Sequence, residues 1–206
     1  YDDKGNTLTE TNGSIVTTYT WDYLSRLTQW TKTGETTEVF LYDADGMRVR
    51  KTPSGGTATS FLLDGSEVAE EISSSQLTSY VGSGLVSKIV GQNSEVYYSD
   101  GLGSTRAMGD DNESVVRSTI YDSFGNVVQG YPNDDASGFG YIGQGRYYTD
   151  ATGLCYVKAR YYSPATGRFI SADPLYYSGG GLNLYAYVDN DPGNYIDPLG
   201  LYKHKP

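Results

Sequence analysis

Two aspartates near the end of the 206-residue chain are each followed directly by proline, in Asp173-Pro174 and Asp197-Pro198. If the fold brings their carboxyl groups into one site, the two cannot both ionise easily, so one of them keeps its proton. The ionised carboxylate could then activate a water molecule while the protonated carboxyl group polarises a carbonyl. The spacing alone favours a plainer interpretation, in which each Asp-Pro pair starts a turn.

Other catalytic and metal-binding chemistry has few candidates in this sequence. The single histidine, His204, follows both aspartates, so no Ser-His or Cys-His triad can form in the earlier part of the chain, and a zinc site lacks ligands. Cys155 is the only cysteine and is expected to be a small core residue. Gly101-Leu102-Gly103-Ser104 lacks the lysine of a phosphate-binding loop and is expected to form a turn. We predict no metal and no cofactor.

The elements that must position the aspartates follow from an internal repeat. An aromatic residue is followed four positions later by glycine, about once in twenty residues, at Tyr1–Gly5, Tyr42–Gly46, Phe61–Gly65, Tyr80–Gly84, Tyr97–Gly101, Tyr121–Gly125 and Tyr141–Gly145. Such a period marks a repeat architecture in which each unit packs against its neighbours. Trp21 fits the spacing, but Ser25 stands in place of the glycine.

The residues within one unit predict a β-hairpin. In Tyr42-Asp43-Ala44-Asp45-Gly46, aspartate can bond its own backbone and glycine can take the left-handed conformation of a turn. Alternation through Ile15, Thr17, Tyr19 and Trp21 predicts a strand, and residues 39–42 read as a buried strand. Residues 67–72 are at best one helical turn. The predicted fold class is all-β, with successive antiparallel hairpins and little helix.

The composition of the chain limits the kinds of molecule that it could bind. The chain carries 21 Tyr and 26 Gly, which suits β-structure with many turns, and its net charge of −10 argues against a nucleic-acid-binding surface. No stretch reaches the roughly 18 apolar residues that span a membrane. The chain begins at Tyr1, inside a repeat-like motif. We therefore interpret it as a piece of a longer polypeptide, whose targeting signals could lie elsewhere.

The most specific pattern is a series of motifs near the end of the chain. They are Arg160-Tyr161-Tyr162-Ser163-Pro164-Ala165-Thr166-Gly167-Arg168-Phe169-Ile170-Ser171-Ala172-Asp173-Pro174, then Asn183-Leu184-Tyr185-Ala186-Tyr187, then Asp197-Pro198-Leu199-Gly200-Leu201. This series resembles the Rhs-associated core of the Rhs and tyrosine-aspartate (YD) repeat proteins. By that resemblance, residues 1–150 are YD repeats, residues 151–201 are the core, and residues 202–206 start a variable C-terminal segment. Ser163 departs from the aspartate common in the family, and Trp21 departs from tyrosine.

The resemblance implies a fold and a function. YD repeats would form a curved, spiralling antiparallel sheet, a β-shell fragment, which the core closes as a plug. The shell would encapsulate a C-terminal toxin cargo, so the expected partners are the remainder of its own shell and that cargo. The expected location is secreted or on the cell surface of a bacterium.

The resemblance also assigns roles to particular residues. Asp173 and Asp197 match the family's self-cleaving aspartate pair, Arg160 matches a helper residue, and the bond to be cut would be Leu201–Tyr202. The chain would then be an intramolecular aspartyl-type autoprotease without an external substrate. Gly200, just before that bond, lets the backbone come close without a Cβ clash. On this basis the catalytic interpretation is favoured over plain Asp-Pro turns.

Two other functions stay open at this point. The chain could belong to an extracellular YD-repeat adhesin or fibre like the shells of teneurins, or to an inert structural scaffold. An open sheet would also leave unpaired edges that recruit partners, so edge-to-edge self-association is expected. A plug further predicts burial of a set of apolar side chains, namely Tyr161, Tyr162, Phe169, Leu184, Tyr185, Tyr187 and Tyr195, with Arg168 near the surface.

Overall fold

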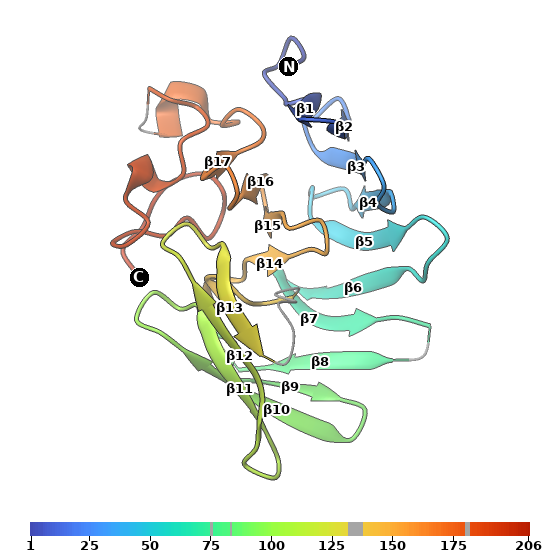
Figure 1. Ribbon diagram of the computed structural model, residues 1–206, viewed down its shortest axis with the longest axis vertical. Helices are drawn as coiled ribbons and strands as arrows, with labels where there is room; N and C mark the ends of the chain where they lie inside the picture. The colour runs from blue at the N-terminus through green and yellow to red at the C-terminus, as the bar shows by residue number, and fades with distance from the viewer. Residues whose placement is uncertain (75, 83, 132–137, 180–181) are drawn as a thin grey trace.

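The computed structural model describes residues 1–74, 76–82, 84–131, 138–179 and 182–206, and its strands form two antiparallel sheets (Figure 1). The larger sheet has thirteen strands, each paired with the next along the chain. These are β1 (Thr9–Asn12), β2 (Ile15–Trp21), β3 (Leu27–Lys32), β4 (Glu38–Tyr42), β5 (Arg48–Pro53), β6 (Thr59–Asp64), β7 (Glu67–Ile72), β8 (Leu77–Val81), β9 (Ser87–Val90), β10 (Asn93–Ser99), β11 (Thr105–Asp110), β12 (Val115–Tyr121) and β13 (Val127–Tyr131).

The smaller sheet follows in sequence as β14 (Tyr148–Thr149), β15 (Cys155–Val157), β16 (Arg160–Ser163) and β17 (Arg168–Phe169). Three short 3₁₀ segments accompany it: η1 (Gly143–Gly145), η2 (Tyr176–Gly179) and η3 (Val188–Asn190). The predicted all-β class, with successive antiparallel hairpins in one curved sheet, is confirmed. Among the described residues, no helix combines the length and the apolar character needed to cross a membrane.

The hairpin turns have the geometry that the repeat predicts. In one unit the Asp122 carboxylate accepts the N–H of Asn126 at 2.9 Å, and Gly125 donates its N–H to the Asp122 carbonyl at 3.1 Å. Gly125 has φ of 93°, a left-handed conformation that glycine adopts freely. Ser25 takes the same conformation, with φ of 62°, in the turn that begins at Asp22. The unit therefore keeps its turn where serine replaces glycine.

The core of the molecule lies between the two sheets. Figure 1 shows the large sheet bending around the small one. One apolar cluster joins them, and it contains Tyr19, Trp30, Phe40, Phe61, Tyr97 and Met108 of the large sheet together with Phe139, Tyr148, Leu154, Tyr156, Tyr161 and Ile170. Phe61 and Tyr97 of the repeat thus line the inner face, and Trp21, Tyr42 and Tyr80 pack against the same cluster.

A buried ion pair connects the sheets at the centre of this cluster. Arg48 of β5 contacts Asp150, which directly follows β14, and both side chains are almost fully enclosed. Arg48 also donates to the Tyr161 hydroxyl at 3.0 Å, and its guanidinium lies 4.5 Å from the centre of the Tyr156 ring. Burial alone would lower the pKa of Arg48, but the neighbouring Asp150 carboxylate raises it well above its ordinary value. This pair holds the large sheet to the small one.

One prediction of burial and one of secondary structure are wrong. Val39 and Leu41 are exposed, at 37% and 51%, because successive side chains of a strand point to opposite faces and Phe40 faces inward with Glu38 and Tyr42. Residues 67–72 form strand β7, paired with β6 and β8, instead of a helical turn. Pairing on both sides satisfies the backbone of this segment, which its polar sequence does not reveal.

The predicted burial of the plug residues is confirmed for some and wrong for others. Tyr161, Tyr162, Phe169 and Tyr187 are buried. Leu184, Tyr185 and Tyr195 are only half-buried. Tyr185 lies at a margin, where its ring packs against Tyr1 and its hydroxyl donates to the Gly5 carbonyl at 2.7 Å. Arg168 is exposed, as expected, and lies over the Tyr185 ring at 4.9 Å.

Candidate functional site

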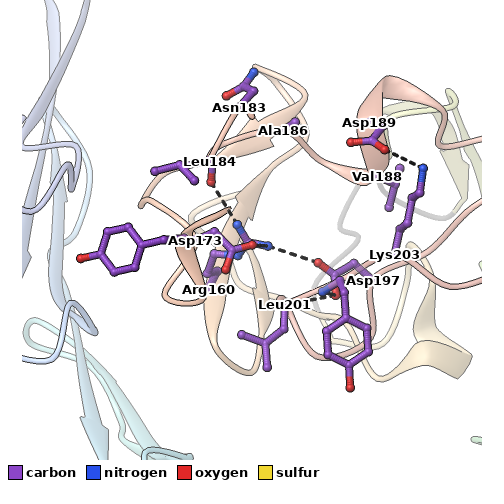
Figure 2. Close-up of a pocket in the computed structure, with 12 residues that line it drawn as sticks. Arg160, Asp173, Asn183, Leu184, Ala186, Val188, Asp189, Asp197, Leu201 and Lys203 are labelled. Carbon is purple, nitrogen blue, oxygen red and sulfur yellow. Dashed lines mark hydrogen bonds and ion pairs between the residues drawn. The ribbon is translucent and has the colours of Figure 1, made fainter. Parts of the chain in front are cut away.

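Three separate segments bring Arg160, Asp173 and Asp197 together, as Figure 2 shows. Arg160 opens β16, in the middle of the small sheet, where pairing with Val157 fixes its backbone. Asp173 follows β17 and accepts the N–H of Leu175 at 2.8 Å, so its Asp-Pro pair does start a turn. Asp197 follows the buried Ile196. All three site side chains are buried.

One nitrogen atom joins the two aspartates. The Nη2 atom of Arg160 lies 3.1 Å from Oδ2 of Asp173 and 3.3 Å from Oδ2 of Asp197. The sequence predicted two carboxyl groups within reach of a shared proton or water. In the structure, the guanidinium that contacts both carboxyl groups balances part of their charge.

The remaining donors of Arg160 hold the backbone around the site. Its Nε atom donates to the carbonyl of Gly200 at 2.5 Å, and Nη1 donates to the carbonyl of Leu184 at 3.2 Å. Burial lowers the pKa of Arg160, while the Asp173 and Asp197 carboxylates raise it. A guanidinium nevertheless keeps its charge in proteins. Arg160 is therefore a fixed cation that contacts both aspartates and holds the backbone just before Leu201.

Asp197 contacts the backbone on both sides of Leu201. Its Oδ1 atom accepts the N–H of Leu201 at 2.9 Å and the N–H of Tyr202 at 3.2 Å. The Tyr202 nitrogen belongs to the Leu201–Tyr202 peptide bond, so this carboxyl group contacts the bond that the family resemblance assigns as the cut site. Burial raises the pKa of Asp197, against the opposing effects of these N–H groups and of Arg160. The environment thus favours a protonated Asp197 more than water would.

Gly200 allows the backbone to approach Arg160 closely. Its φ is 68°, and a Cβ at this position would lie 2.4 Å from the carbonyl oxygen of Val157 and 3.1 Å from the Arg160 nitrogen. Both the conformation and the space exclude a larger residue without movement of the backbone. The expected close approach at Gly200 is therefore present, against the strand that carries Arg160.

A cavity of about 100 Å³ opens beside these groups. Arg160, Asp173, Asp197, Leu201 and Tyr202 line it. Because a water molecule takes about 30 Å³ of liquid volume, the cavity has room for a few waters next to both carboxyl groups. The site can therefore bring water, a carboxylate pair and a peptide bond together. Among the described residues, no cluster of three or more His, Cys, Asp or Glu side chains is arranged to hold a metal ion.

Sequence reasoning missed a tyrosine that supports the site. The Tyr147 hydroxyl accepts the N–H of Asp197 at 2.7 Å and lies 3.1 Å from the Tyr187 hydroxyl, with both rings buried. Burial raises the pKa of Tyr147 well above its ordinary value, so the hydroxyl stays neutral. No local motif marks this residue, because its partner lies far along the chain. Its place among twenty-one tyrosines hides it further.

Comparison with known proteins agrees with the fold and the repeat. The chain is 33% identical over 212 residues to the tRNA3(Ser)-specific nuclease WapA of Bacillus spizizenii, which covers 97% of this chain and 9% of that protein. It is 27% identical over 243 residues to the double-stranded DNA deaminase toxin A of Burkholderia cenocepacia, covering 98% and 16%. The chain therefore spans a small part of the length of these relatives.

A solved structure has the same fold. The Photorhabdus luminescens Tc holotoxin pore superposes with a TM-score of 0.75 and 22% identity, over 99% of this chain and 11% of that one. The family model for the teneurin YD-shell matches residues 75–193, more than half of the sequence. Together with the hairpin repeat and the curved sheet, these matches show that the chain belongs to the YD-shell family of Rhs and YD-repeat proteins.

Proposed function

We propose that this chain closes a β-shell around a C-terminal toxin cargo and cuts itself between Leu201 and Tyr202. One arrangement carries the self-cleavage proposal. A single nitrogen of Arg160 contacts both Asp173 and Asp197, while Asp197 contacts the N–H of the Leu201–Tyr202 bond. A pair of plain Asp-Pro turns would not require such contacts.

The two aspartates take different parts in the proposed reaction. Asp197, whose pKa burial raises, is the acid, and Asp173, which contacts Arg160 at 3.1 Å, is the base. A water molecule from the cavity gives a proton to Asp173 as its oxygen attacks the Leu201 carbonyl carbon. When the carbon–nitrogen bond breaks, the Tyr202 nitrogen, whose N–H had donated to Asp197 at 3.2 Å, loses its planar amide geometry and takes the proton of Asp197. The products are a Leu201 carboxyl group and a Tyr202 amine, and the step leaves Asp173 protonated and Asp197 ionised.

Arg160 has two functions in this scheme. Its positive charge stabilises the carboxylate that remains ionised, and its contact with the Gly200 carbonyl fixes the chain next to the reacting bond. Positioning of this kind supplies much of the rate in intramolecular reactions.

The encapsulation proposal rests on the fold and on the relatives. The Tc holotoxin pore contains this fold, and relatives named as a nuclease and a deaminase toxin share the sequence. We propose that residues 1–150 form the repeat sheet, residues 151–201 form the plug, and residues 202–206 begin the cargo side. The second sheet starts at Tyr148, close to the proposed boundary. The shell's other turns would be its partners, at a secreted or cell-surface location.

The edges of the large sheet suggest a further contact. Among the described strands, β1 pairs only with β2 and β13 pairs only with β12. Unpaired edges recruit strands, so we propose edge-to-edge association of this chain. Light scattering over a range of concentrations should then report a mass that grows with concentration. A constant monomer mass at high concentration would instead mean that the edges are protected.

Intact-mass measurement of the chain and its variants tests self-cleavage. The wild-type chain is expected to yield residues 1–201, whereas Asp173→Asn and Asp197→Asn should remain uncut while still unfolding cooperatively. The matched control is Asp45→Asn, which makes the same change at an exposed turn aspartate and should be cut like the wild type. If both site variants are cut at the wild-type rate, the aspartates are inert and the scaffold interpretation holds.

A further inference from the structure

The segment after the proposed cut is held in a defined place by the chain just before Asp197. His204 and Ile196 form an antiparallel β-bridge, in which each donates its N–H to the other's carbonyl, at 2.6 and 2.9 Å. The Lys203 ammonium lies 2.6 Å from the Asp189 carboxylate and 4.7 Å from the centre of the Tyr195 ring. Residues 202–204 are therefore bound through both backbone and side chain.

The residue that binds Lys203 is presented by an unusual turn. Val188, Asp189 and Asn190 have φ of 42°, 56° and 60°, three consecutive left-handed residues without a glycine. A β-branched residue such as Val188 is disfavoured there, so the surrounding packing must enforce the turn. Val188 is buried, and the preceding Tyr187 is enclosed among Tyr147, Tyr162 and Phe169. Figure 2 shows Asp189 at this turn, directed toward Lys203.

These contacts fix the position of the Leu201–Tyr202 bond. Ile196 directly precedes Asp197, so the bridge to His204 closes the chain between them into a short loop. Within that loop Asp197 holds the N–H groups of Leu201 and Tyr202. A shift of the segment by one residue would move a different peptide bond to Asp197 and break the bridge. Asp189, Tyr195 and Ile196 thus determine which bond faces the carboxyl groups.

We infer that Asp189, Tyr195 and Ile196 form a binding site for an extended peptide segment that carries a basic residue at the second position after the cut bond. We call these three residues the exit cradle. The inference deepens the proposed function, because the exit cradle sets the register of the cut. The exit cradle also keeps hold of the new N-terminus, since none of its contacts involves the bond that breaks.

The cut itself should strengthen this hold. Before cleavage, the Tyr202 nitrogen is a neutral amide 3.2 Å from Oδ1 of Asp197. After cleavage, the same nitrogen is an amine that gains a proton near neutral pH. An ammonium next to a carboxylate forms a charge-assisted hydrogen bond, stronger than the neutral one it replaces. The released segment is thus expected to leave slowly, with its first three residues still bound.

Amide hydrogen exchange tests the exit cradle without any need for cleavage. All chains carry Asp173→Asn so that none is cut, and exchange is followed at the His204 and Ile196 amides. Asp189→Asn removes an exposed ion pair and should raise exchange about two- to fivefold. Lys203→Ala also removes the ring contact and should raise it about three- to thirtyfold. The control, Lys205→Ala at an exposed neighbouring lysine, should leave it unchanged.

A charge exchange separates the ion pair from other effects of substitution. Asp189→Lys alone should raise the exchange rate of the His204 amide, and adding Lys203→Asp should lower that rate again. The inference is overturned if the His204 amide of the parent chain exchanges as fast as an unprotected amide, or if Lys203→Ala matches Lys205→Ala. Because these readouts use an uncut chain, they stand or fall separately from the self-cleavage proposal.

The same substitutions then show whether the exit cradle sets the register. In the chain with Asp173 intact, Lys203→Ala should slow the formation of the 1–201 product and allow cuts at neighbouring bonds, which intact mass resolves. Suppose the hydrogen-exchange results are as expected, but the cleavage rate and the cut position of Lys203→Ala equal those of the wild type. The exit cradle would then only hold the segment, and its part in choosing the bond would be overturned.

Discussion

At the scale of single residues, the buried carboxyl group of Asp197 has a consequence for stability. Burial raises its pKa in the folded chain above the value of about 3.9 for an unfolded aspartate. A raised folded pKa gives stability that is fully present below the unfolded pKa and is lost as pH rises through the folded pKa. Asp197→Asn removes this titration. Stability of the parent chain should therefore fall relative to the variant as pH rises above about 4.

Denaturant unfolding at a series of pH values measures this effect. Both chains carry Asp173→Asn, so that neither is cut during the experiment. The informative quantity is the change with pH in the difference between their free energies of unfolding. That difference also contains the lost contact with Arg160. A difference that stays constant from about pH 3 to 7 would contradict the raised pKa.

Gly200 provides a second residue-scale prediction. In Gly200→Ala the new Cβ would lie 2.4 Å from the Val157 carbonyl oxygen, so the backbone before Leu201 must move away from Arg160. Displacement of a reacting group by about 1 Å can lower a rate about a hundredfold. Self-cleavage, followed by intact mass, should therefore slow at least tenfold. Gly193→Ala is the matched control, because a Cβ there meets nothing within 4 Å. Equal cleavage of the two variants would mean that the close approach is unimportant.

At the scale of elements, the hairpin turns depend on glycine in two separable ways. Gly13 and Gly125 both have positive φ, but a Cβ at Gly125 would lie 2.6 Å from the Tyr141 ring, whereas at Gly13 it would meet nothing within 4 Å. Gly13→Ala should lower the free energy of unfolding by about 1–2 kcal/mol, from backbone conformation alone. Gly125→Ala should lower it by about 1–3 kcal/mol more, from overpacking. Chemical denaturation measures both. Equal losses of unfolding free energy in the two variants would show that the Tyr141 ring moves aside at no cost.

The sequence predicts these elements well because their signals are local. The spacing from aromatic to glycine identifies the hairpins, and the turn geometry survives even where Ser25 replaces glycine. Strand β7 was missed because its acidic residues hide the alternation. The outward positions of Val39 and Leu41 were missed because an apolar run reads the same on either face. Burial depends on the neighbouring strands and not on the run itself.

In the candidate site, too, the residues marked by local motifs could be predicted and those with distant partners could not. The motifs containing Arg160, Asp173 and Asp197 single out those residues, although not the guanidinium that contacts both carboxyl groups. Tyr147 and the Asp189–Lys203 pair were not foreseen. Their partners are distant in sequence or depend on a turn of disfavoured conformation, and neither circumstance leaves a local pattern.

At the scale of the whole molecule, the buried pair of Arg48 and Asp150 holds the sheets together. Removing one member of a buried ion pair leaves an uncompensated charge, which costs about 3–5 kcal/mol. Arg48→Met should lower the free energy of unfolding by the lower end of this range, because Lys51 still lies 3.3 Å from the Asp150 carboxylate. Arg50→Met, on the exposed face of the same strand, should change it by less than about 0.5 kcal/mol. If both variants unfold at the same denaturant concentration, the pair does not hold the sheets together.

A chain that cuts itself does so at a rate independent of its concentration, so the dependence of the cut on dilution is the decisive measurement. The uncut chain is followed by intact mass at protein concentrations that span a hundredfold range. Intramolecular hydrolysis predicts one first-order rate at every dilution, with residues 1–201 as the large product. A rate that falls in proportion to dilution, or a cut at another bond, would contradict the account and assign the cleavage to a second molecule or to a different site.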